Sequence, residues 1–100
     1  MRVISPKPLR DFWEQYPDAE VSLRLWYKTA IHAEWNSLQD VRCDYPHADG
    51  VRTGGGDTLT VFNIGGNKYR LIVRIRYDYQ LVNVRCVLTH AEYDEGNWKE

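Results

Sequence analysis

The sequence predicts an α+β fold in which two N-terminal helices pack on one face of a small antiparallel sheet. Large apolar residues recur at helical spacing near the N-terminus, and β-branched residues dominate three later runs. Gly65-Gly66 separates two of those runs, which is typical of a hairpin turn. The expected order, β-α-α-β-β-β, gives helices layered on a sheet.

Composition supports a compact protein of one domain spanning residues 1–100. The chain has 13 Lys+Arg and 14 Asp+Glu, giving a formal net charge of -1, and 43% of it is hydrophobic. Four Trp and seven Tyr argue against intrinsic disorder. No apolar run approaches the ~20 residues of a membrane helix, and the N-terminus is too polar for a signal peptide. We therefore expect a cytoplasmic protein without a membrane partner.

The first element is a short extended segment, residues 2–4. Ser5 followed by Pro6 is typical of a helix N-cap and first turn. The apolar residues of this helix share one face and are Leu9, Phe12, Trp13 and Tyr16. Pro17 is expected to end it.

A second helix is expected to begin at Asp18 as its cap. Its apolar stripe consists of Leu23, Trp26, Tyr27, Ala30 and Ile31. Ser37 and Asp40 have the spacing of a capping box and predict a short helical turn that ends at Tyr45-Pro46. Residues 47–57 show no periodicity and contain four glycines, so they are predicted to form a flexible loop.

Three strands should follow, over residues 59–64, 69–79 and 81–89. Alternation in the second strand places Tyr69, Leu71, Val73, Ile75 and Tyr77 toward the helices, and Arg70, Ile72, Arg74, Arg76 and Asp78 on the other face. In the third strand Val82, Val84, Cys86 and Leu88 should point inward, and Asn83, Arg85 and Thr89 outward. Helices on one face would leave the arginine face open.

The open face is locally basic, although the whole chain is not. Residues 67–90 carry five basic residues against Asp78 alone. The face would present Arg70, Arg74, Arg76 and Arg85, with Asn67 and Lys68 at the hairpin. Charge alone favours a plain solvated strand face, although an anionic or phosphate partner could also use this basic surface.

His90 and Tyr93 follow the last strand, next to this face. Guanidinium groups can stabilise the charge of a pentacovalent phosphate, and an imidazole can move a proton of the ribose hydroxyl or the leaving oxygen. This combination suits RNA cleavage without a metal or cofactor. The alternative is a structural role, with His90 capping the helix or strand end and Tyr93 packing.

Metal binding and other common active sites find no support in the sequence. The three histidines lie far apart, without a paired ligand at i+3 or i+4, and the two cysteines, Cys43 and Cys86, form no CxxC motif. No GxSxG, Ser/His/Asp order or phosphate-binding loop is present. We expect neither a metal site nor a disulfide.

Several segments together resemble a known family. They are MRVIS, LRDFW, YPDAE, LRLWY, VFNIGGNKYRLIVRI and VLTHAEYD, in this order from Met1 to about Asp94. They resemble the HigB family of type II toxin–antitoxin toxins, a branch of the RelE-like toxins. The combination of FNIGGNKYRL and THAEYD carries most of this resemblance.

The resemblance implies a small cytoplasmic ribonuclease that cuts mRNA, commonly on the translating ribosome. It also implies inhibition by a HigA-like antitoxin with a helix-turn-helix DNA-binding domain. By position, the first motif supplies Asn67, Lys68 and Arg70, and the second supplies His90, Tyr93 and Asp94. The catalytic candidates are His90, Tyr93 and Arg70, and the RNA-binding candidates are Asn67, Lys68, Arg74, Arg76 and Arg85.

Two hypotheses therefore stand beside each other. The first is an mRNA endoribonuclease toxin. The second is a non-catalytic protein on the same scaffold that binds RNA or an antitoxin. The basic face serves both, but only the first needs His90 and Tyr93 near a phosphate. The near-neutral charge and acidic tail differ from the strong basicity of many such toxins.

Overall fold

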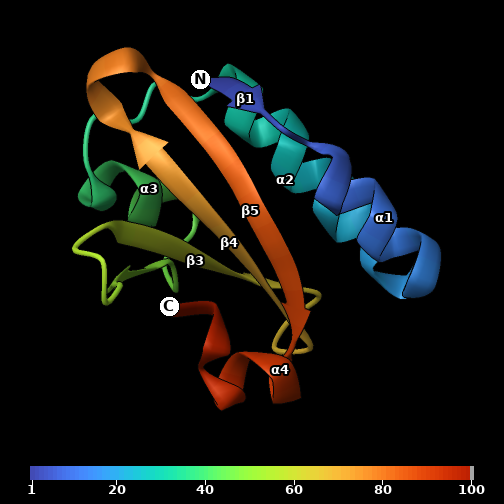
Figure 1. The fold of residues 1–100 in the computed structure, drawn as a ribbon. Coiled ribbons are helices and arrows are strands. Elements are labelled where there is room, and N and C mark those ends of the chain that lie inside the picture. Colours follow the sequence, from blue (N-terminus) through green and yellow to red (C-terminus); the bar gives the residue numbers. More distant parts are fainter. Residues whose placement is uncertain (100) are drawn as a thin grey trace.

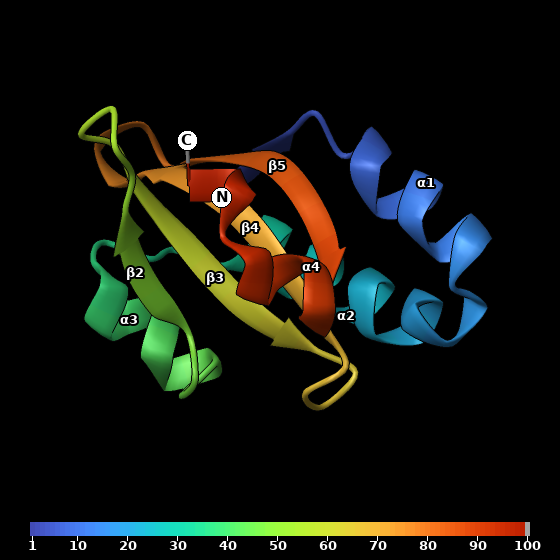
Figure 2. The ribbon, with the colours of Figure 1, turned by 60° about the horizontal axis from the view of Figure 1, so that its bottom comes forward.

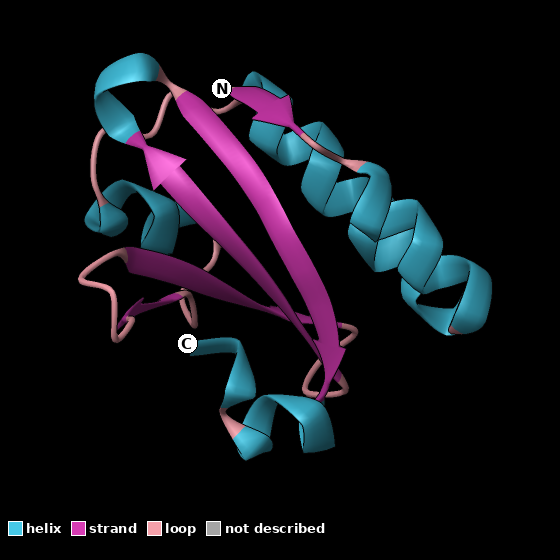
Figure 3. Ribbon diagram, viewed as in Figure 1, coloured by secondary structure: helices cyan, strands magenta, loops and turns pink. Residues whose placement is uncertain are grey.

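The computed structural model describes residues 1–99 and confirms the α+β class (Figures 1 and 3). Its sheet has the strand order β1-β5-β4-β3-β2. The strands are β1 (Arg2–Ile4), β2 (Asp49–Arg52), β3 (Thr58–Ile64), β4 (Tyr69–Arg76) and β5 (Leu81–Thr89). The helices are α1 (Lys7–Gln15), α2 (Glu20–His32), α3 (Leu38–Asp44) and α4 (His90–Glu95), with 3₁₀ turns η1 (Pro17–Ala19), η2 (Tyr77–Tyr79) and η3 (Asn97–Lys99). No helix in residues 1–99 is long and apolar enough to cross a membrane.

The sequence predicted an antiparallel sheet, but the sheet in the structure is mixed. β1 runs parallel to β5, with Val3 opposite Val82, while the other neighbouring strands are antiparallel. β1 is followed by two helices instead of a hairpin, and a long connection of this kind permits parallel pairing.

The segment 47–57, predicted as a loop, contains strand β2. Gly50 lies opposite Thr60 of β3. A β-carbon at Gly50 would lie 3.3 Å from Leu38 Cδ2, so the absence of a side chain lets α3 approach this strand. The side chains of β2 are mostly exposed, so its sequence shows no alternation of apolar residues. Backbone pairing with β3 holds it in the sheet, and the sequence pattern therefore did not reveal it.

Two predicted helix caps are wrong. Ser5 has a left-handed backbone (φ 54°) and Pro6 occupies the N-cap of α1 without a side-chain cap. Asp18 lies in η1, and Ala19 is the N-cap of α2. The third cap is confirmed, because Ser37 Oγ accepts a hydrogen bond from the Asp40 amide at 3.3 Å.

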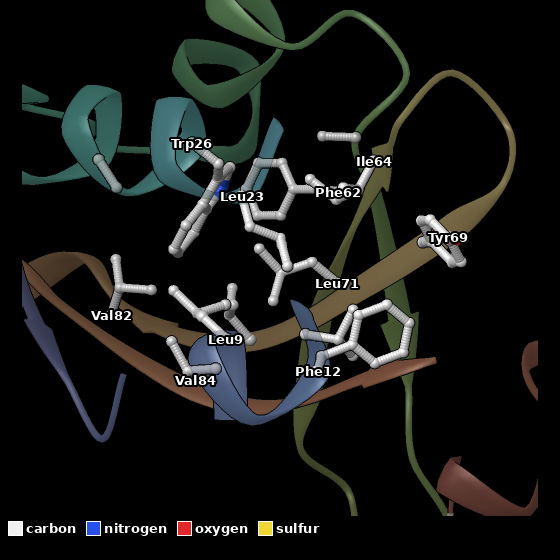
Figure 4. Packing of buried hydrophobic residues seen from close by; sticks show 14 of the residues in the cluster. Leu9, Phe12, Leu23, Trp26, Phe62, Ile64, Tyr69, Leu71, Val82 and Val84 are labelled. Carbon is white, nitrogen blue, oxygen red and sulfur yellow. The ribbon is translucent and has the colours of Figure 1, made fainter. Parts of the chain in front are cut away.

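The main core lies between α1, α2 and the sheet (Figure 4). Of the predicted core residues, Phe12, Trp26, Leu71, Val73 and Val84 are buried there, while Trp13 packs half-buried at its edge. Trp26 and Phe62 meet edge to face, with ring centroids 5.5 Å apart. Leu88 is not part of this core, and the reason lies in strand β5.

A β-bulge at Arg85 changes the predicted facing of β5. Val73 pairs with Val84 but Ile72 pairs with Cys86, so Arg85 has no partner on β4. One extra residue reverses the alternation. Beyond the bulge Val87 joins the main core, and Cys86 and Leu88 lie on the opposite face.

The predicted strand 69–79 ends earlier, at Arg76. Residues 77–79 form η2, and Gln80 follows in the left-handed region with φ 52°. Gln80 Nε2 donates to the Trp35 carbonyl at 2.6 Å, which fixes this turn against the α2–α3 connection.

The sheet face away from α1 and α2 is only partly open. A second apolar cluster, Leu59, Val61 and Ile72, is buried there beneath Tyr93 and Trp98. Figure 2 shows α4 and the C-terminal segment in front of the strands, with α2 partly hidden behind them. The predicted arginine face therefore has a buried apolar cluster at its centre and is not fully open.

Candidate active site

The candidate site forms where β5 passes directly into α4. The Thr89 hydroxyl accepts from the Glu92 amide at 3.2 Å, and the Glu92 carboxylate accepts from the Thr89 amide at 2.9 Å. This reciprocal cap begins α4 one residue after the strand. The His90 amide donates to the Lys68 carbonyl at 3.2 Å, which joins α4 to the β3–β4 hairpin.

His90 is held by a carboxylate one helical turn away. Its Nδ1 lies 2.9 Å from Asp94 Oδ2, and both side chains are more than half exposed. When Nδ1 carries the proton donated to Asp94, Nε2 is left with a free lone pair. The pair thus orients the imidazole and leaves its outer nitrogen available for proton transfer.

Tyr93 lies between the basic and apolar parts of this surface. Arg70 Cζ is 5.4 Å from the Tyr93 ring centroid, and the Trp98 ring stacks on Tyr93 with centroids 4.9 Å apart. Burial raises the pKa of Tyr93, and the negative charge of Asp49 raises it further. The phenol therefore keeps its proton at neutral pH and can donate a hydrogen bond.

Arg70 is oriented by the hairpin that precedes it. Its Nη1 donates to the Asn67 carbonyl at 3.1 Å and to the Tyr69 carbonyl at 3.2 Å. Asn67 is itself held by Asn63, whose amide donates to Asn67 Oδ1 at 3.3 Å. Within residues 1–99 no carboxylate forms an ion pair with Arg70. Its guanidinium can thus accept an external anion.

The other predicted RNA-binding residues are dispersed. Lys68 Nζ is 3.2 Å from Asp18 at the α1–α2 corner, and Arg76 pairs with Asp78 at 3.5 Å beside η2. Arg85 lines a small groove with Phe12 and other α1 residues. Arg74 follows Arg70 along the same face of β4, beyond Ile72, and pairs with Asp57 at 3.6 Å.

The structure thus brings three of the predicted residues into contact, because Arg70 lies over Tyr93 and donates to the Asn67 carbonyl. His90 is joined to the same hairpin through its backbone amide, and its side chain pairs with Asp94. The side chains of three others point away from this site. Lys68 pairs with Asp18, Arg76 pairs with Asp78, and the β-bulge displaces Arg85. Arg74 is the remaining basic residue that continues the site along the strand.

Sequence reasoning missed the contributions of Asn63 and Trp98. The i+4 spacing of Asp94 from His90 within THAEYD was a local signal for that pair. Asn63 and Trp98 had no such local signal. Asn63 reaches the site through the pairing of β3 with β4, and Trp98 reaches it because the chain reverses after Gly96.

A larger groove, of about 780 Å³, lies between α1 and α2, away from these residues. It is lined by Trp13, Tyr27 and Arg24, among others, and none of the candidate site residues borders it. No group of three or more His, Cys, Asp or Glu side chains in residues 1–99 could hold a metal ion.

Comparisons with known proteins give one matching family and several similar proteins. The HigB toxin family, described as the RelE-like toxic component of a toxin-antitoxin system, matches residues 19–96. The mRNA interferase toxin HigB of Escherichia coli K12 is 30% identical over 94 residues, covering 94% of this chain and 88% of that protein. The mRNA interferase HigB of Shigella flexneri gives the same values. The mRNA interferase HigB of Escherichia coli O6:H1 is 25% identical, covering 95% and 90%.

Proposed function

The chain belongs to the HigB family of RelE-like toxins, and on this premise we propose that it is an endoribonuclease that cleaves mRNA as the toxin of a type II toxin–antitoxin pair. The single observation that carries the proposal is that Arg70 lies over the ring of Tyr93, which shares the short helix α4 with the His90–Asp94 pair. The similar proteins of Escherichia coli and Shigella flexneri bear the name mRNA interferase. Cleavage of mRNA would stop translation.

The chemistry is an in-line attack of the ribose 2'-oxygen on the adjacent phosphorus. A bond forms between the 2'-oxygen and phosphorus, and the bond from phosphorus to the 5'-oxygen breaks. The products are a 2',3'-cyclic phosphate and a 5'-hydroxyl. Arg70 stabilises the added negative charge of the pentacovalent transition state, because its fork can hold two phosphate oxygens.

Two proton transfers accompany this attack. His90 Nε2 takes the proton of the 2'-hydroxyl, since Asp94 engages the other nitrogen and stabilises the imidazolium that forms. Tyr93, which burial keeps protonated, donates its hydroxyl proton to the leaving 5'-oxygen as the bond from phosphorus breaks. Exchange with water then returns the proton to Tyr93 and removes the one held by His90. Asn67 fixes Arg70, and Arg74 contacts a neighbouring phosphate once RNA replaces Asp57.

The partners follow from the family and the charge. We propose a HigA-like helix-turn-helix antitoxin and, as the site of action, mRNA on the translating ribosome in the cytoplasm. The formal net charge of -1 provides little attraction for naked RNA. Tethering by the ribosome would raise the local concentration of the substrate and compensate for this.

The experiment that tests the proposal compares wild type with His90→Ala in growth and in RNA cleavage. Wild type should arrest growth on induction, and mapped mRNA ends should carry a 5'-hydroxyl. Cleavage of a short RNA by concentrated protein in EDTA tests metal independence, and EDTA-sensitive cutting would contradict the mechanism. RNA binding without any new ends would favour the non-catalytic alternative.

A further inference from the structure

The last described turn, η3, lies outside the residues that the family comparison matches, yet it contacts the candidate site. The Trp98 indole stacks on the Tyr93 ring with 17° between their planes. Its Nε1–H donates to the Tyr93 carbonyl at 2.9 Å. One contact to the ring and one to the backbone together restrict both the place and the tilt of Tyr93.

The turn that carries Trp98 is anchored at both ends. Gly96, at φ 79°, reverses the chain after α4, and the Lys99 amide donates to its carbonyl at 3.2 Å. The Gly54 amide, from the glycine-rich segment, donates to the Lys99 carbonyl at 3.2 Å. Trp98 is therefore held from α4 on one side and from the β2–β3 connection on the other.

Apolar packing explains why the indole lies here. Trp98 and Tyr93 are both half-buried against the second cluster of Leu59, Val61 and Ile72. Without Trp98, part of this cluster and one contact of the Tyr93 ring would be exposed to water. The ring would then be free to rotate away from Arg70, which lies over it.

We propose that Trp98 is a positioning residue that holds the Tyr93 ring beside Arg70 for RNA cleavage. This inference rests on the proposed function, because it assigns a role in that reaction. Trp98 touches the catalytic candidates through the ring and the carbonyl of Tyr93, so its effect passes through Tyr93. The C-terminal turn thereby completes a site whose other members come from β4 and α4.

The first test measures single-turnover cleavage of RNA by the full chain. Trp98→Ala should lower the rate roughly 10- to 100-fold, as expected for a misplaced catalytic group, with little change in KM. Trp98→Phe keeps the stacking ring but lacks the N–H donor, and it should restore most of the rate. Trp13→Ala is the matched control, because Trp13 is also half-buried but lies in the α1–α2 groove.

The second test does not depend on activity. Burial raises the pKa of Tyr93, so Trp98→Ala should shift its titration toward lower pH, and Trp98→Phe should reverse most of that shift. Tyrosine ring-carbon NMR measures this, with the resonance assigned by Tyr93→Phe. If Trp98→Ala does not fold, Trp98→Leu keeps the apolar cover without an aromatic ring and should show the same loss of rate.

The outcomes separate this inference from the proposed function. If wild type cleaves RNA and Trp98→Ala cleaves as fast as Trp13→Ala, the positioning role is wrong and the function stands. An unchanged Tyr93 titration in Trp98→Ala also overturns it. If wild type makes no cuts, the proposed function fails, and the titration still decides whether Trp98 holds Tyr93.

Discussion

The guanidinium of Arg70 lies over the ring of Tyr93, with its Cζ 5.4 Å from the ring centroid. The two residues come from β4 and α4. Arg70 pairs with Leu88 of β5, and α4 follows directly after β5, so the pairing of these strands brings Tyr93 to Arg70. On this shared surface the Arg70 guanidinium can bind the phosphate, and the Tyr93 phenol can give a proton to the oxygen that leaves it. The geometry makes Arg70 the first residue to test.

Arg70→Ala should abolish RNA cleavage and leave the fold intact, because the side chain is only partly buried. Arg70→Lys should also be impaired, since an ammonium cannot reproduce a two-pronged contact with phosphate. Arg76→Ala, which removes a cation paired with Asp78 beside η2, is the control and should remain toxic. Full toxicity of Arg70→Ala at equal expression would rule out its role.

His90→Ala should reduce cleavage about 10²–10⁴-fold, the usual contribution of a positioned acid or base, while RNA binding is retained. Asp94→Asn should cause a smaller loss, because the imidazole stays but loses its orienting carboxylate. His32→Ala changes an exposed histidine at the end of α2 and serves as the control. Wild-type rates for His90→Gln would show that His90 is structural.

Leu71→Ala should lower the free energy of unfolding by about 2–5 kcal/mol, because it leaves a cavity beneath α1 and α2. Leu71 is fully buried in the main core, whereas Val21 is 78% exposed on α2. Val21→Ala should therefore change stability by less than about 0.5 kcal/mol. Urea unfolding of both variants measures the difference, and equal midpoints would contradict the described packing.

The Asp18–Tyr69 hydrogen bond should make stability fall at both extremes of pH. The Tyr69 hydroxyl donates to Asp18 Oδ1 at 2.7 Å. This bond, together with Lys68, holds the pKa of Asp18 below its usual 3.8. The stability that ionised Asp18 provides is therefore present above pH 3.8 and is lost as pH falls through the lowered pKa. The same bond raises the pKa of Tyr69 from 10.0 to about 12, so its contribution is present below pH 10 and is lost as pH rises toward 12.

Tyr69→Phe is the matched control for this pH dependence. It keeps the ring packed against Phe12 and Tyr16 but removes the donor. The difference in unfolding free energy between wild type and Tyr69→Phe should be largest between pH 3.8 and pH 10, where Asp18 is ionised and Tyr69 is protonated. It should shrink at lower and at higher pH. A difference that does not depend on pH would contradict the assignment of both shifts to this bond.

Much of the fold and half of the site could be predicted from local patterns. Apolar residues at helical spacing located α1 and α2, and alternation located β3, β4 and β5. The THAEYD segment indicated both His90 and Tyr93, and most of it forms helix α4. The hairpin motif indicated Asn67 and Arg70 as further candidates. These signals are local, since spacing along the chain fixes which residues share a face.

Tertiary structure alone decided where the remaining basic residues lie. The bulge at Arg85 arises from the pairing of β4 with β5, which no single segment encodes, and it reverses the facing of Cys86 and Leu88. Lys68 turns to Asp18 because folding brings the α1–α2 corner to the hairpin. Trp98 covers the second apolar cluster because the chain reverses at Gly96. The sequence by itself determined α1, α2, the positions of β3, β4 and β5, and the family, because those signals are local. Contacts between distant segments determined strand β2, the facing of β5 beyond the bulge and the membership of the candidate site.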